Sequence, residues 1–205
     1  MKFERFPLGI YQANCYVIFD ENNFESAIID PGGDFDILKE FIEKNELTIK
    51  YIILTHAHAD HIGALTELRE YTNAKVCIHE YDSEALQNCN INLSSMMGKN
   101  KIEVKPDIIL HDKDELLIGK TLLEVIHTQG HTKGSISIKC NDVIFTGDTL
   151  FAGSIGRTDL AGGSYDDIIK SLQKIIRYSD DALICPGHGP SSQIKTEKVT
   201  NPFIR

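Results

Sequence analysis

The segment LTHAHADHIG, residues 54–63, constrains the fold of this chain more than any other feature. It places three histidines and one aspartate within six positions, from His56 to His61. The preceding YIIL has the β-branched residues of a buried strand, and the following IGALTELREYT has a helical apolar period. The polar side chains therefore lie on a strand-to-helix turn. Burying them without a bound partner would be costly, so we expect a metal site here.

The spacing within this segment divides its ligands into two pairs. Side chains at positions i and i+2 of an extended chain point the same way, so His56 and His58 can converge on one ion. Asp60 and His61 lie where the chain turns, and they need not reach the same ion. Four ligand-type side chains in so short a segment indicate two adjacent ions.

Three other segments contain a histidine or an aspartate beside glycine, and glycine allows the backbone to bend so that these side chains reach inward. They are TQGHTKGS with His131, IFTGDTLF with Asp148, and ICPGHGP with His188. Together with the first segment they provide two sets of three ligands and one bridging carboxylate. We predict His56, His58 and His131 for one ion, Asp60, His61 and His188 for the other, and Asp148 between them.

The predicted ligands also predict the chemistry. Two divalent ions carry more positive charge than two carboxylates remove, and a metal-bound water can have a pKa of about 7. We therefore expect a hydroxide that bridges the two ions, with neutral imidazoles as ligands. His and Asp suit zinc, iron and manganese. We expect two divalent ions, zinc before iron or manganese.

Each half of the chain runs from strands to a helix. In the first half, strand-like CYVIFD and SAIIDPGG precede the helical DFDILKEFIEKNEL, with Asp34 as a candidate N-cap. In the second half, TLLEVIHT, SISIKC and DVIFTGD precede the amphipathic SYDDIIKSLQKII. Hydrophobic strands need cover, so we expect an α/β fold of four layers, αββα, although a single mixed sheet also fits. We place residues 1–205 in one domain.

Composition restricts the classes of partner. The formal net charge is -9 and no basic stripe is present, which disfavours nucleic acid. No apolar run is long enough to span a membrane, and MKFERFPLGI does not resemble a secretory signal. The five cysteines are widely spaced without a C-x-x-C pair, which is typical of a reducing compartment. We expect a cytoplasmic protein; its oligomeric state cannot be read from the sequence.

Several polar features are expected to be structural. His79, His111 and His127 stand alone in the sequence, and a lone histidine is more often a hydrogen-bonded residue of the fold than a ligand. His127 falls within a strand-like run. Residues 90–106 are polar without a clear period, which predicts a surface loop.

The order THAHADH, GHTKGS, FTGDTLF and CPGH resembles the metallo-beta-lactamase superfamily, from about Asn14 to the C-terminus. The resemblance implies an αββα sandwich with its site at one edge of the two sheets, and the same ligand assignment. In IIDPGGD it further implies that Asp30 braces the metal-binding loop, although a simple turn residue explains Asp30 equally well.

Within that superfamily, GDTLFAGSIGRTDLAGGS resembles the glyoxalase II branch, the hydroxyacylglutathione hydrolases. This implies hydrolysis of a small-molecule thioester such as S-lactoylglutathione, with Asp60 orienting the hydroxide. Arg157 would contact the thiol peptide, unless it is an ordinary surface residue paired with Asp159. The chain departs from the larger members of this branch because only SSQIKTEKVTNPFIR follows the last segment, and Pro190 replaces their tyrosine. It resembles the short, single-domain bacterial hydrolases.

Four alternatives are weighed against the thioester hydrolase. Persulfide dioxygenases also share a GRTD-like segment and use one iron, which His56, His131 and Asp148 would hold here. Their last histidine lies in AHDY, whereas this chain has GHGP, which favours the hydrolase. No residue argues against a lactonase, and a nuclease is disfavoured by the acidic balance. A binding protein without catalysis would need no open position between the ions.

Overall fold

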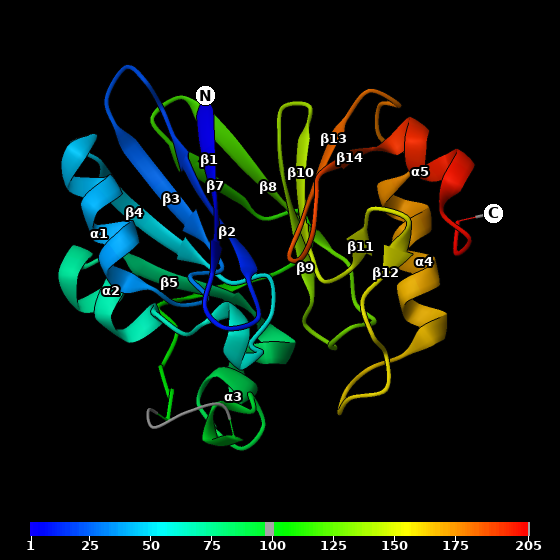
Figure 1. Cartoon of the computed structure of the whole chain (residues 1–205), viewed down its shortest axis with the longest axis horizontal. Coiled ribbons are helices and arrows are strands. Elements are labelled where there is room, and N and C mark those ends of the chain that lie inside the picture. The colour runs from blue at the N-terminus through cyan, green and yellow to red at the C-terminus, as the bar shows by residue number, and fades with distance from the viewer. Residues whose placement is uncertain (97–100, 205) are drawn as a thin grey trace.

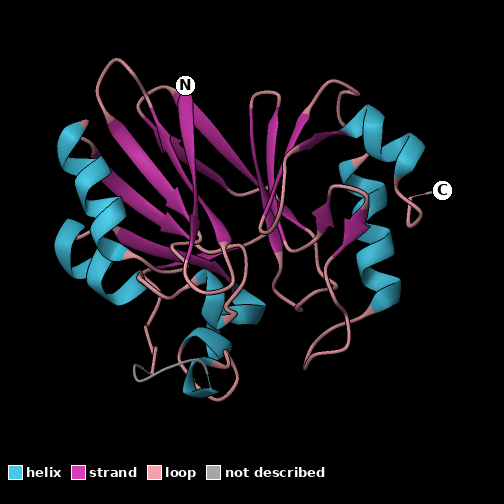
Figure 2. Ribbon diagram, in the orientation of Figure 1, coloured by secondary structure: helices cyan, strands magenta, loops and turns pink. Residues whose placement is uncertain are grey.

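The computed structural model describes residues 1–96 and 101–204. Two six-stranded sheets pack face to face, and helices cover their outer faces (Figures 1 and 2). The first sheet uses strands from the first half of the chain, and the second sheet uses strands from the second half. These four layers confirm the predicted αββα sandwich and show that the strands do not merge into a single mixed sheet.

The first sheet keeps its strands in chain order. β2 is antiparallel to both β1 and β3, and β3, β4, β5 and β6 run parallel. Helices α1 (Phe35–Lys44) and α2 (Leu65–Thr72) cover its outer face. The strands are β1 Lys2–Leu8, β2 Ala13–Phe19, β3 Glu25–Ile29, β4 Thr48–Ile53, β5 Lys75–His79 and β6 Ile108–Leu110.

The second sheet has the order β14-β13-β10-β9-β8-β7. Its strands are β7 Glu115–Ile118, β8 Thr121–His127, β9 Ile136–Cys140, β10 Val143–Gly147, β13 Leu183–Pro186 and β14 Ser192–Gln193. Helices α4 (Tyr165–Ile175) and α5 (Ile194–Thr200) lie on its outer side, and β11 (Leu150–Phe151) and β12 (Ser154–Ile155) form a separate hairpin.

Three apolar clusters separate the four layers. The central cluster lies between the sheets and contains Tyr16, Ile53 and Phe145. One outer cluster joins the first sheet to α1 and α2, and the other joins the second sheet to α4 and α5. All five cysteines are buried and free, as expected of small apolar residues. Among the described residues no helix is long and apolar enough to cross a bilayer.

The strand directions bring the predicted ligands to one edge of the sandwich. β8 and β10 are both antiparallel to β9, and β13 is parallel to β10, so all three strands end at the same edge of their sheet. The predicted ligands of the second half follow these ends. In the first sheet, β4 leads directly into the short helix η1 (Ala59–His61), which contains Asp60.

Two local expectations need correction. Asp34 stands at the N-cap of α1, but its side chain makes no cap hydrogen bond; its Oδ2 instead accepts from the Gly9 N–H at 2.8 Å. The predicted surface loop at 90–106 is packed more closely than expected, because Asn92 is buried and donates to the Ile102 carbonyl at 2.8 Å. Positions 97–100 of that loop lie outside the described residues.

The remaining short elements lie near this edge. They are η2 (Glu80–Asp82), α3 (Ser83–Leu86) and η3 (Ser94–Met96), which follow β5 along the chain.

Candidate metal centre

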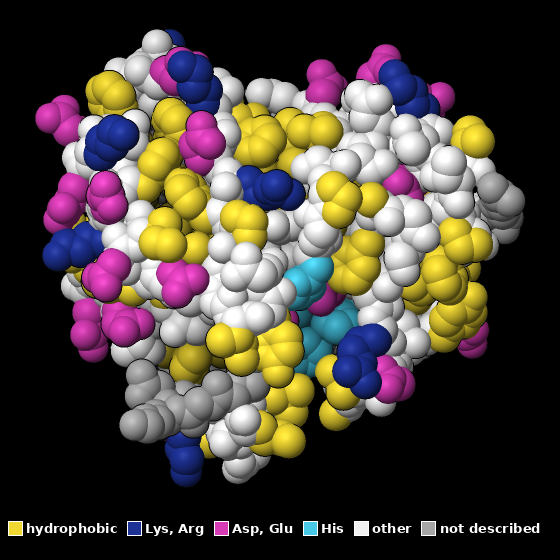
Figure 3. Space-filling view, viewed as in Figure 1, with side chains coloured by type: hydrophobic (Ala, Val, Ile, Leu, Met, Phe, Trp, Pro, Cys, Tyr) yellow, Lys and Arg dark blue, Asp and Glu magenta, His cyan; other side chains and the backbone are white. Residues whose placement is uncertain are grey.

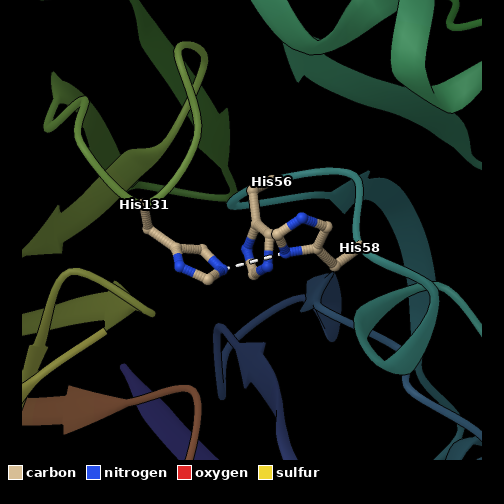
Figure 4. Close-up of side chains that lie close together, drawn as sticks. All are labelled: His56, His58 and His131. Carbon is tan, nitrogen blue, oxygen red and sulfur yellow. Dashed lines mark hydrogen bonds between the residues drawn. The ribbon is translucent and has the colours of Figure 1, made fainter. Parts of the chain in front are cut away.

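Three histidines from the two sheets meet at the edge of the sandwich. His56 and His58 follow β4, and His131 lies in the loop between β8 and β9 (Figure 4). Their ligating nitrogens lie within 4.8 Å of one another, and His58 Nδ1 is 2.9 Å from His131 Nε2. The i and i+2 positions therefore do place His56 and His58 toward a common point.

A second group of three ligand-type side chains lies beside the first. Its ligand atoms, from Asp60, His61 and His188, also lie within 4.8 Å of one another. His188 Nε2 is 3.3 Å from Asp60 Oδ2, and His61 Nε2 is 3.8 Å from the same oxygen. His61 is fully buried, whereas the other two side chains are partly exposed.

Asp148 lies between these two groups. Its Oδ1 is 3.4 Å from His61 Nε2, and its Oδ2 is 3.7 Å from the Nε2 atoms of both His131 and His188. One carboxylate thus faces members of both groups, as a bridging ligand must. We call these seven side chains the ligand cluster: His56, His58, Asp60, His61, His131, Asp148 and His188.

The polar atoms of the ligand cluster fit divalent ions. His56 Nε2, His61 Nε2 and Asp148 Oδ1 are buried and have no hydrogen-bond partner among the described residues. Buried polar atoms are otherwise almost always paired, because leaving one unsatisfied costs about 1–3 kcal/mol. Imidazole nitrogen and carboxylate oxygen are suitable ligands for zinc, iron and manganese. Ion binding would therefore satisfy the atoms that the protein leaves unpaired.

Electrostatics differ between the two groups. Burial and the neighbouring imidazoles lower the pKa of His56 well below its usual value and that of His58 to about 4. Burial alone would lower the pKa of His61, but the carboxylates of Asp148 and Asp30 raise it. His56 and His58 are therefore neutral imidazoles, which is the form that ligates metals, whereas His61 of the second group is tied to carboxylates.

Asp30 braces the loop that carries the first ligands. Its Oδ1 accepts from the Thr55 N–H at 2.8 Å, and its Oδ2 accepts from the Thr55 hydroxyl at 2.6 Å. The same Oδ2 lies 3.0 Å from His61 Nδ1 and fixes the orientation of that ring. Both oxygens are thus engaged within the protein, which favours a bracing role over a ligand role and over a simple turn residue.

Residues 8–188 match the family described as the metallo-beta-lactamase superfamily. The chain belongs to this superfamily. The matched range contains the whole ligand cluster. The match confirms the family resemblance seen in the sequence, and it agrees with the sandwich of two sheets.

Relatives of similar length share this superfamily fold. Probable metallo-hydrolase YqgX of Bacillus subtilis is 38% identical over 208 residues, which cover 100% of this chain and 98% of that protein. Hydroxyacylglutathione hydrolase GloC of Haemophilus influenzae is 35% identical over 209 residues, with 100% and 98% covered. The family and the His/Asp cluster together support a metal-dependent hydrolase.

Solved structures of similar proteins have the same fold as this chain. The BLEG-1 B3 metallo-beta-lactamase superposes with a TM-score of 0.92 at 38% identity, covering 99% of each chain. TTHA1623 in a di-iron-bound form gives 0.87 at 29% identity, covering 98% of this chain and 99% of its own. ETHE1 from Myxococcus xanthus gives 0.81 at 28% identity, covering 98% and 84%. Since one of these structures holds iron, the fold is not restricted to zinc.

Among the described residues, Arg157 contacts the ligand cluster with its backbone carbonyl and not with its guanidinium. Its carbonyl is 2.7 Å from His131 Nδ1, which fixes the orientation of that ring. Its guanidinium is exposed and binds both oxygens of Asp159, at 2.7 and 2.8 Å. The ion pair anticipated from the sequence is therefore present.

The ligand cluster opens onto the molecular surface. Figure 3 shows histidine side chains at the bottom of a hollow, with a basic side chain at its rim. A pocket of about 190 Å³ adjoins His58 and is lined by Ala57, Ala85, Ile91, Lys133 and Ala161, among others. Its lining combines apolar side chains with charged and polar ones, including Lys133 and Glu84, and its small volume suits a small organic molecule more than a polymer.

The other histidines lie apart from the ligand cluster. His79 and His127 stack at 4.0 Å between ring centroids, and His111 is exposed beside them. His127 ends β8, as its strand-like surroundings predicted. None of the three belongs to a group of possible metal ligands among the described residues. Their stacking and hydrogen bonds agree with the structural role expected for them.

One buried carboxylate near the ligand cluster was missed by sequence reasoning. Asp82, in η2, is only 3% exposed and touches two of the ligand loops. It occurs in the sequence HEYDSEAL, which lacks the glycine that marks the segments of His131, Asp148 and His188. Only the fold brings the end of β5 next to the loops that follow β4 and β8.

Proposed function

We propose that this protein hydrolyses small thioesters of the S-lactoylglutathione type, with two divalent ions, zinc before iron or manganese. The observation that carries the proposal is the position of Asp148 between two groups of three ligand-type side chains. The thioester is favoured because GloC, a relative over the whole chain, is named a hydroxyacylglutathione hydrolase. The GRTD segment with Arg157 supports the same choice.

The ligand cluster would hold one ion on His56, His58 and His131 and the other on Asp60, His61 and His188, with Asp148 shared. Bound there, the ions would supply a water of lowered pKa and a Lewis acid for the substrate carbonyl.

Asp60 has a role beside its ligand role. Its carboxylate is partly exposed, and one oxygen pairs with His188. Burial would raise the pKa of Asp60, but the hydrogen bond from His188 and the nearby His61 lower it, so the group is ionised at neutral pH. An ionised carboxylate accepts a hydrogen bond from the attacking water and turns its lone pair toward the carbonyl carbon.

The reaction balances without any further reactant. The water oxygen bonds to the carbonyl carbon and the carbon–sulfur bond breaks. The thiolate takes the proton that the water loses, so a carboxylic acid and a thiol leave. The pocket beside His58 offers room for one part of the substrate, and the exposed guanidinium of Arg157 can bind a carboxylate of the other part.

A β-lactam is a second candidate substrate. It is favoured by the 38% identity and TM-score of 0.92 with a protein described as a B3 metallo-beta-lactamase. Both reactions add water to a carbonyl carbon, so the ligand cluster suits either.

The test is an assay of the purified protein with its metal content measured by elemental analysis. We expect two equivalents of zinc and turnover of S-lactoylglutathione. A protein with two ions that opens a β-lactam or a lactone but no thioester would overturn the substrate assignment. Oxygen consumption with glutathione persulfide and a single bound iron would instead establish the dioxygenase.

Arg157→Ala should raise KM for S-lactoylglutathione by about 10-fold and change kcat little, because one charge-assisted hydrogen bond is worth about 1.5–3 kcal/mol. The exposed pair with Asp159 is weak, so the guanidinium can exchange it for a substrate carboxylate. Steady-state kinetics provide the measurement. The matched control is Arg177→Ala, at an exposed position just after the end of α4, with unchanged kinetics. Equal KM values for the Arg157 variant and the wild type would show that the residue does not bind substrate.

A further inference from the structure

Asp82 is a buried carboxylate that contacts the two loops of the three-histidine group. It follows β5 at the end of η2 and contributes no ligand atom to the groups described above. Its Oδ2 accepts from the Ala57 N–H at 3.1 Å and from the Thr132 hydroxyl at 2.9 Å. Its Oδ1 accepts from the Gly134 N–H at 2.8 Å.

Two of these three donors stand next to a proposed ligand in the chain, and Gly134 lies three positions after His131. Ala57 lies between His56 and His58 in the loop after β4, and Thr132 follows His131 in the loop after β8. These loops belong to different sheets, so the three histidines converge only if the loops are held together (Figure 4). A backbone hydrogen bond from Ile136 to Thr55 joins the loops at their base, and Asp82 joins them beside the ligands.

We propose that Asp82 is a positioning residue for the ion bound by His56, His58 and His131. This inference rests on the proposed two-ion site. Asp30 makes the corresponding contact for the other ion, because its Oδ2 lies 3.0 Å from His61 Nδ1. Asp82 thus holds the two loops of the three-histidine group, whereas Asp30 contacts His61 of the second group and, through Thr55, the loop of His56.

A carboxylate is required at position 82 because all its partners are donors. Two N–H groups and one hydroxyl point at its two oxygens, and Thr132 can accept in turn from the Ser135 hydroxyl at 2.8 Å. An asparagine has one oxygen and one NH2 group, so in either orientation an NH2 faces at least one donor. The loop also packs directly on Asp82, because a Cβ at Gly134 would lie 2.6 Å from Asp82 Oδ1.

The test measures zinc affinity in proteins reduced to one site, by competition with a chromogenic chelator. His188→Ala removes a ligand of the second group and leaves the three-histidine group, and His58→Ala does the reverse. In the His188→Ala background, Asp82→Asn should weaken zinc binding by about 10–100-fold. In the His58→Ala background, the same substitution should change zinc affinity by less than about 3-fold.

Asp30→Asn is the comparison and should weaken zinc binding in both backgrounds, because Asp30 contacts His61 directly and holds the loop of His56 through Thr55. A role of Asp82 confined to general stability would weaken zinc binding similarly in both backgrounds, and that result would overturn the inference. So would unchanged affinity in the His188→Ala background. If Asp82→Asn fails to fold, Thr132→Val removes only the hydroxyl donor and should lower affinity about 3–10-fold in the same background.

The inference and the proposed function fail in distinguishable ways. Zinc affinity is measured without any substrate, so a protein that binds two zinc ions but hydrolyses no thioester would overturn the proposed function alone. A wild-type protein that hydrolyses S-lactoylglutathione but shows no site-selective effect of Asp82→Asn would overturn only the role of Asp82.

Discussion

Gly187→Ala should reduce metal affinity and hydrolytic rate by about 100-fold each, although it removes no ligand. Gly187 is buried between β13 and His188, and its N–H and carbonyl hydrogen-bond to Gly147 and Asn14 of two neighbouring segments. A Cβ at this position would lie 2.2 Å from Asp148 Oδ1 and 2.8 Å from His61 Cε1. Since both backbone groups are fixed, the Asp148 carboxylate, which faces both ligand groups, must move.

Zinc titration and kcat for S-lactoylglutathione measure this effect. The control is Gly153→Ala, in the turn of the β11–β12 hairpin, where a Cβ would meet nothing within 4 Å. Gly153 has a φ of +71°, so its substitution costs about 1 kcal/mol of stability. That variant should nevertheless keep wild-type zinc affinity. Similar zinc affinities for the two variants would contradict the crowding argument.

The ligand cluster could be predicted from sequence because its chemistry is local. His56, His58 and His61 share one segment, so the two periodicities of strand and turn already separate them into two directions. The sequence also marks the other three ligands, because each is a histidine or an aspartate, which is costly to bury, near the end of a strand-like run. They are His131, Asp148 and His188. Such signals survive without knowledge of the fold, because they depend on a few neighbouring residues.

The supporting residues could not be predicted because their partners are distant in the chain. Asp82 acts on Ala57 and Gly134, which are 25 and 52 positions away, and nothing in its own neighbourhood marks it. Asp34 shows the opposite error, since a local N-cap rule named it and a contact with the distant Gly9 took its carboxylate instead. Tertiary hydrogen bonds thus decided both roles.

The choice between two sheets and one also depended on distant contacts. Apolar strands in both halves need cover, and the sequence alone allowed one mixed sheet or two facing sheets. Tyr16 of the first sheet packs on Phe145 of the second, with ring centroids 4.9 Å apart, and the Tyr16 hydroxyl donates to the Pro186 carbonyl at 2.8 Å. Such contacts between the facing sheets join the two halves of the chain near the ligand cluster.

Metal loading should raise the midpoint of thermal unfolding by about 5–10 °C for each ion when free zinc is 100 times its dissociation constant. Binding then stabilises the folded protein by about 2.7 kcal/mol, and 1 kcal/mol shifts the midpoint of a chain of this size by roughly 2–4 °C. This stabilisation would come from ligation of three buried atoms that have no hydrogen-bond partner among the described residues: His56 Nε2, His61 Nε2 and Asp148 Oδ1. Calorimetry with zinc and after chelation provides the measurement.

Asp148→Asn should remove most of this stabilisation, because an amide lacks the negative charge and one of the two oxygens that face both ligand groups. In the metal-free protein the same substitution removes the Asp148 carboxylate. Burial would raise the pKa of this group, but the neighbouring His61 holds it low. The variant should therefore unfold at nearly the same temperature with and without zinc. A midpoint that still rises by about 5–10 °C per ion at saturation would show that the ions bind without a bridging carboxylate and would overturn the role proposed for Asp148.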